Sequence, residues 1–202
     1  MEKKIAQLIS VLFHPMLMPT YALVLFLNID YFIAFSYSTE IKTYFIAFIF
    51  IMTFVIPASL MFVLKKLQVI ESIQMNQRQE RMVPLIMMSV VYYITYYSLD
   101  KIGVLNVYNL FLLGITAVTL FTMVINLYTK ISLHMISMGG IAGVMLGLLL
   151  IYPLDLRWLL YLLFLLSGIV AYARLTVSDH TMRQVYNGFM LGFVVMLALF
   201  VL

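Results

Sequence analysis

The chain has 202 residues, of which 65% are hydrophobic and 10% charged, and its formal net charge is +4. This composition excludes an ordinary soluble domain and predicts an integral membrane protein. The chain contains no cysteine, which excludes a disulfide framework and a thiolate metal site. We interpret the modest positive charge as a signal of membrane topology, and we expect no nucleic-acid partner.

The first apolar stretch covers about residues 5–28 and contains His14-Pro15 and Pro19. Its length and the lack of a small-residue cleavage site favour a retained helix over a signal peptide. The prolines predict a kink within it. A lone histidine in a kinked membrane helix is most simply interpreted as a packed, hydrogen-bonded side chain, so His14 is not counted as a site residue.

The remaining apolar stretches follow one another with short polar breaks. They cover about residues 43–64, 83–99, 104–128, 130–152, 156–175 and 183–202. We therefore expect an all-α fold, a polytopic transmembrane helix bundle of about six to seven spans that forms a single domain over residues 1–202. Within the stretch at 130–152 Gly139, Gly143 and Gly147 form a small-xxx-small face, which predicts close helix packing.

Three polar stretches between the spans carry the candidate site residues. If the chain has seven spans, the loops after the second, fourth and sixth lie on the same side of the membrane, so these stretches can meet at one surface. The candidate residues are Arg81 in the first stretch, Lys130, Ser132 and His134 in the second, and Arg174, His180 and Gln184 in the third.

The third stretch resembles a motif of a known family. It reads Ala173-Arg174, five residues, His180, three residues and Gln184. This resembles the third motif of the type 2 phosphatidic acid phosphatase superfamily, Ser-Arg-x5-His-x3-Asp, found in integral membrane lipid phosphatases that are related to vanadium haloperoxidases. The chain departs from the motif at Gln184, where the family has Asp.

The other two stretches match the family's remaining motifs in part. Ser132 and His134 resemble Pro-Ser-Gly-His, but Ile131 and Leu133 replace its Pro and Gly. Arg81 and the nearby Pro84 resemble the second half of Lys-x6-Arg-Pro. The motif's lysine is replaced by Gln74, and Lys130 is a candidate to supply the missing charge. The chain is therefore similar to a divergent member of the family.

The resemblance implies a phosphatidic-acid-phosphatase-like core and a metal-independent phosphatase that hydrolyses a lipid phosphate or diphosphate taken from the bilayer. His180 would be the nucleophile that forms a phosphohistidine, and His134 the general acid and later base, which suits the chemistry of imidazole. Gln184 would orient His180 through its amide oxygen without supplying charge. The cations and hydroxyls that stabilise the phosphate oxygens would come from Arg81, Lys130, Ser132 and Arg174. No metal or cofactor is implied.

Two alternatives remain open at the level of sequence. The first is a catalytically impaired family member that binds anionic lipid headgroups or a membrane partner. The second is a purely structural origin of the pattern, with flanking Arg and Lys as topology signals and Ser178 or Asp179 capping the last helix. An intramembrane serine protease is disfavoured because Ser132 and His134 are two residues apart.

Charge asymmetry predicts the orientation. With the proposed phosphate-binding residues left out, six basic residues fall on the side of the motifs and three on the other side. The positive-inside rule then predicts a cytoplasmic site, in an integral protein of a bacterial-type inner membrane.

Overall fold

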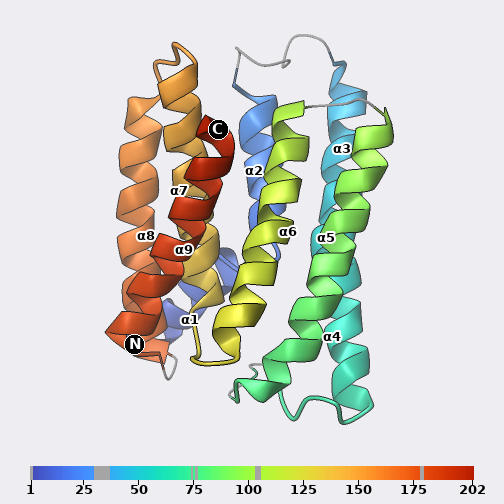
Figure 1. Cartoon of the computed structure of the whole chain (residues 1–202), viewed down its shortest axis with the longest axis vertical. Coiled ribbons are helices and arrows are strands. Elements are labelled where there is room, and N and C mark those ends of the chain that lie inside the picture. The colour runs from blue at the N-terminus through green and yellow to red at the C-terminus, as the bar shows by residue number, and fades with distance from the viewer. Residues whose placement is uncertain (1, 30–36, 74, 76, 103–105, 178–179) are drawn as a thin grey trace. The chain divides into compact units, whose positions relative to one another are not determined.

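The computed structural model describes residues 2–29, 37–73, 75, 77–102, 106–177 and 180–202, and the regular structure of this part of the chain is helical. Six of its helices are long and apolar enough to cross a membrane, which confirms the predicted all-α, polytopic architecture (Figure 1). The helices form two compact units. Met1–Pro15 and Tyr128–Leu202 make the terminal unit, and Met16–Leu127 makes the middle unit. The prediction of one domain stays a prediction.

The middle unit holds a long helix with a defect near its centre. Pro57 has no N–H to give to the carbonyl of Thr53, and the chain forms one π turn, in which the Ile56 N–H donates to the Ile51 carbonyl. The helices of this unit are α2 (Met18–Leu27), α3 (Thr39–Phe50), the π turn (Ile51–Val55), α4 (Ile56–Lys66), the 3-10 turn η2 (Gln79–Arg81), α5 (Met82–Ile102) and α6 (Asn106–Asn126).

The terminal unit contains α1 (Glu2–Leu12), α7 (Leu133–Ile151), α8 (Arg157–Val177) and α9 (Met182–Val201). Helices α7 and α9 approach until their backbones touch. A Cβ added to Gly139 would overlap the carbonyl of Phe189, and one added to Gly192 would overlap the carbonyl of Ile136. The close packing predicted from the small-xxx-small face is therefore confirmed.

The first apolar stretch is not one kinked helix, as the sequence predicted. Helix α1 ends at Leu12 and α2 begins at Met18, and their 11 and 10 residues are each too few for a membrane span of about 20 residues. Pro15 explains the break, because it has no N–H for the carbonyl of Val11. The His14 N–H donates to that carbonyl instead, at 3.3 Å.

Candidate functional site

The N-termini of α7 and α9 lie against each other at one end of the terminal unit. The Ser132 N–H donates to the carbonyl of Gln184 at 3.3 Å. A Cβ on Gly188 would come within 2.8 Å of the Ser132 carbonyl, so glycine lets α9 approach this point. The stretches that hold His134 and His180 therefore lie against each other at this end of the unit.

Gln184 fixes the tautomer of His180. Its side-chain oxygen accepts from the Thr181 N–H at 3.2 Å, as part of a capping box at the start of α9, and lies 3.1 Å from His180 Nδ1. Since the Thr181 N–H requires an oxygen, the orientation of the amide is set, and His180 Nδ1 must carry the donated hydrogen. The Nε2 of the neutral ring therefore keeps its lone pair. The contact expected between these side chains is present, although His180 precedes the helix.

His134 is oriented by the backbone of α1. Its Nε2 lies 3.0 Å from the Ser10 carbonyl, and a carbonyl can only accept, so Nε2 carries the hydrogen. Ser10 offers this carbonyl because the His14 N–H, its usual partner in a helix, bonds to Val11 instead. Pro15 thus acts on the site through the last turn of α1. The nitrogen of His134 that remains for chemistry is Nδ1.

Arg174 supplies positive charge beside this histidine. It lies in the last turn of α8, and its Nη1 donates to Ser10 Oγ at 3.2 Å. Its charge acts on both His14 and His134. Ser10 is buried and holds both sides of the cluster, since its hydroxyl accepts from Arg174 and its carbonyl accepts from His134.

His14 belongs to the cluster, which the sequence analysis missed. Its ring meets the ring of His134 edge-on, with centroids 5.6 Å apart. Burial, and then the charge of Arg174, lower the pKa of His14 from its ordinary value of 6.5. The available signal was the four-residue spacing of Ser10 and His14, which places two polar side chains on one helix face directly before Pro15.

Ser132 is the best candidate for a direct ligand contact. It is fully buried, and its hydroxyl has no hydrogen-bond partner among the described residues. It occupies the N-cap position of α7 but makes no side-chain cap. Leaving a buried hydroxyl unsatisfied costs about 1–3 kcal/mol, so this position favours a bound acceptor. Lys130 is half-buried two residues earlier.

Arg81 lies in the middle unit. Its side chain is 6% exposed, and its Nε donates to the Met75 carbonyl at 3.1 Å. Its predicted role in phosphate binding stays a prediction. Gln74, Ser178 and Asp179 lie outside the described residues, and the N-cap of α9 is Thr181.

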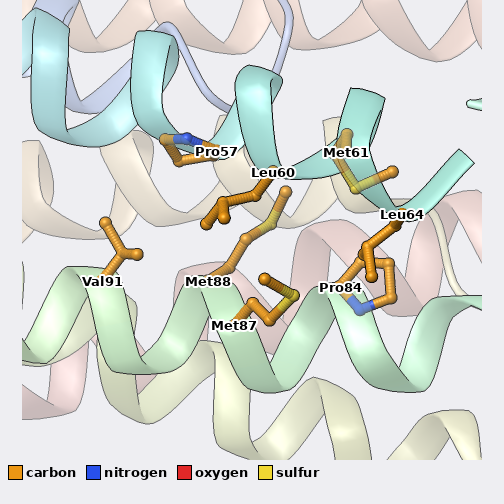
Figure 2. Close-up of a pocket in the computed structure, with 8 residues that line it drawn as sticks. All are labelled: Pro57, Leu60, Met61, Leu64, Pro84, Met87, Met88 and Val91. Carbon is orange, nitrogen blue, oxygen red and sulfur yellow. The ribbon is translucent and has the colours of Figure 1, made fainter. Parts of the chain in front are cut away.

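The middle unit also contains a small apolar pocket between α4 and α5, shown in Figure 2. It has no ionisable or hydroxyl side chain in its wall, so the wall offers no acid, base or nucleophile. The lining residues are Pro57, Leu60, Met61 and Leu64 from α4, and Pro84, Met87, Met88 and Val91 from α5.

The cluster in the terminal unit has the chemistry of an anion site. Two helix N-termini and Arg174 favour a negative ligand, and two imidazoles with fixed tautomers lie beside them. In the described part of the chain no group of three His, Cys, Asp or Glu side chains is arranged to hold a metal ion. Comparisons of the chain with protein-family models, with curated proteins and with solved structures find no match.

Proposed function

We propose that this protein is a metal-independent phosphatase that hydrolyses a lipid phosphate or diphosphate through a phosphohistidine on His180. The observation that carries this is the pairing of His180 Nδ1 with Gln184, which places the hydrogen of the neutral ring on Nδ1 and makes Nε2 the unprotonated, nucleophilic nitrogen. Lys130, Ser132 and Arg174 are the proposed ligands of the phosphate oxygens. The proposed substrate reaches them from the surrounding bilayer.

In the first step the His180 Nε2 lone pair forms a bond to phosphorus, and the bond from phosphorus to the lipid oxygen breaks. The leaving oxygen takes the electron pair and a proton from Nδ1 of His134, which carries its second proton when the negative charge of the bound phosphate offsets that of Arg174. Throughout, the Nε2 hydrogen of His134 stays hydrogen-bonded to the Ser10 carbonyl. Arg174 and the Ser132 hydroxyl stabilise the charge on the phosphoryl oxygens.

In the second step neutral His134 acts as the base. Its Nδ1 takes a proton from water while the water oxygen bonds to phosphorus, and the bond from phosphorus to His180 Nε2 breaks. The electron pair returns to Nε2, inorganic phosphate leaves, and His134 is again protonated for the next cycle.

One observation favours a second, non-catalytic function. Gln184 accepts hydrogen bonds but carries no charge, so it cannot offset the positive charge of a phosphorylated imidazole. In serine proteases, replacing the Asp that orients the catalytic His with its amide lowers kcat by about 10⁴. The second candidate is therefore a protein of the same build that binds anionic lipid headgroups, or a membrane partner, without turnover.

Purified protein separates the two candidates. We would assay phosphate release from phosphatidate, phosphatidylglycerophosphate and polyprenyl diphosphate in detergent with EDTA, alongside headgroup binding. Turnover that is lost in His180→Ala and His134→Ala supports the phosphatase. Binding without turnover of any of the three lipids supports the second candidate.

Arg157→Gln is a matched control for Arg174→Gln, because the two arginines lie at opposite ends of α8. We expect only Arg174→Gln to weaken substrate binding. Equal effects of the two substitutions would contradict the proposed role of Arg174.

We also propose that the site faces the cytoplasm, in a bacterial-type inner membrane. Lys3, Lys4 and Arg183 belong to segments at the same end of the terminal unit as the cluster, whereas Arg157 begins α8 at the other end. Such an excess of basic residues is typical of the cytoplasmic side. Reporter fusions after Leu202 and within the 152–156 loop test this orientation.

A further inference from the structure

Helix α1 lies across α8 and not along it. Glu2 Oε1 accepts from the Tyr172 hydroxyl at 2.7 Å, and Ser10 Oγ accepts from Arg174 at 3.2 Å. Residues 2 and 10 are about 12 Å apart along a helix, whereas residues 172 and 174 point to nearly opposite sides of α8, which is about 10–12 Å wide. Helix α1 therefore spans the width of α8 near the C-terminal end of α8.

This crossing gives α1 a direction relative to the membrane. Helix α8 has 21 residues and is apolar enough to cross the bilayer. A helix that crosses the end of α8 sideways runs close to the membrane plane, at the level where α8 leaves the hydrocarbon core of the bilayer. With 11 residues, α1 is also too short to span the membrane itself.

The two sides of α1 differ in what they contact. Ala6 and Ser10, four residues apart, form the buried side. Ile5, Leu8 and Leu12 follow one another at helical spacing on the opposite side and are 53%, 60% and 51% exposed. A stripe of exposed large apolar side chains on a helix at this level matches the boundary between headgroups and acyl chains.

The charges on α1 indicate which lipid surface it fits. Lys3 and Lys4 are both exposed at the start of the helix. The acidic residue beside them, Glu2, is held by the Tyr172 hydroxyl. Lys4 borders the apolar stripe, since it precedes Leu8 by four residues, and exposed lysines beside such a stripe attract anionic headgroups.

We propose that α1 is an interfacial helix that binds the surface of an anionic bilayer, with Ile5, Leu8 and Leu12 in the acyl boundary and Lys3 and Lys4 at the headgroups. The opposite side of the helix holds His134 and Arg174 through Ser10. The membrane surface and the histidine cluster are thus linked by one helix. The surface position of α1 does not depend on the proposed phosphatase activity.

Spin labelling tests this position directly, because the chain has no cysteine to remove. Single Ile5→Cys and Leu12→Cys variants would be labelled with a nitroxide in vesicles of phosphatidylcholine and phosphatidylglycerol. Power saturation with oxygen and with a water-soluble nickel chelate then gives the depth of each label. We expect the same shallow depth for both, since they share one face of a helix that lies in the membrane plane.

Trp158→Cys and Leu165→Cys are the matched control, with the same seven-residue spacing on exposed positions of α8. We expect their depths to differ by about 10 Å, as in a spanning helix. A difference of that size between the labels on α1 would overturn the proposal. Labels on α1 that neither reagent reaches would also overturn it, because they would show a protein covering this face.

The lysines are tested by lipid composition. We expect the α1 labels to sit deeper in vesicles with phosphatidylglycerol than in phosphatidylcholine alone, and Lys3→Gln with Lys4→Gln to remove that difference. Equal depths in both lipids with the lysines present would overturn the assignment of an anionic surface.

Discussion

The amide of Gln184 can be converted to a carboxylate with almost no change in shape. In a Gln184→Glu variant the carboxylate would accept from the same two donors, the Thr181 N–H and His180 Nδ1–H. It would also place a negative charge in the first turn of α9, where the helix dipole favours it by about 0.3–1 kcal/mol. We therefore expect the variant to fold and to be slightly more stable.

The effect on catalysis follows from the distance. Opposite unit charges 3.1 Å apart attract by about 5 kcal/mol at an effective dielectric constant of about 20. Gln184 is half-buried, so solvent screening reduces the net gain to about 1–2 kcal/mol. This gain applies only when His180 is positively charged, as it is after phosphorylation. We take the formation of the phosphohistidine as the slow step and therefore expect phosphate release to be about five- to thirtyfold faster.

The assay is the initial rate of phosphate release from the best substrate, with thermal unfolding measured on the same samples. Gln184→Leu is the opposite control, since it keeps the size of the side chain but removes the acceptor. We expect it to lower both the rate and the melting temperature. A Gln184→Glu variant that is stable but no faster than the parent protein would refute the assigned role of this pair.

Four further substitutions give separable results. Gly192→Leu forces a side chain into the backbone of α7, and we expect it to lower the unfolding free energy by at least about 3 kcal/mol. Gly168→Ala, where a Cβ meets nothing within 4 Å, should raise it by about 0.5–1 kcal/mol in the same denaturation assay. Pro15→Ala restores an N–H to the last turn of α1, and we expect it to withdraw the Ser10 carbonyl from the site and slow turnover with little change in melting temperature. Because the pKa of His14 is lowered below 6.5, the unfolded chain binds its proton more readily, so stability should fall as the pH drops below about 6.5. His14→Phe should remove that part of the pH dependence of melting, and an unchanged pH dependence would contradict it.

Much of the fold could be predicted because membrane helices need long apolar stretches. The stretches predicted at 83–99 and 183–202 correspond to α5 and α9, with boundaries that differ by a few residues. The prediction was wrong at residues 5–28, where hydropathy runs on through a break made by Pro15. A hydropathy profile reports how favourably side chains enter lipid, and it does not respond to the missing backbone N–H of Pro15.

The candidate site was predictable where it depends on topology and not where it depends on backbone hydrogen bonding. Counting spans was enough to bring His134 and His180 to one end of the terminal unit. The role of Ser10 was not predictable. Its carbonyl loses its usual helical donor at the end of α1 and accepts from His134 instead. His14 was missed for the same reason. No pattern of side-chain types indicates which backbone groups remain available.

The contact between α7 and α9 has one more consequence. The two helices that begin beside His134 and His180 meet through glycines, and at Gly139, Gly143 and Gly192 the nearest atoms across the contact belong to the main chain. The starts of the two helices are therefore held together by main-chain contacts that do not shift when neighbouring side chains change rotamer. Substitutions on the outward-facing sides of both helices can therefore adapt the protein to another membrane thickness or composition without changing this contact.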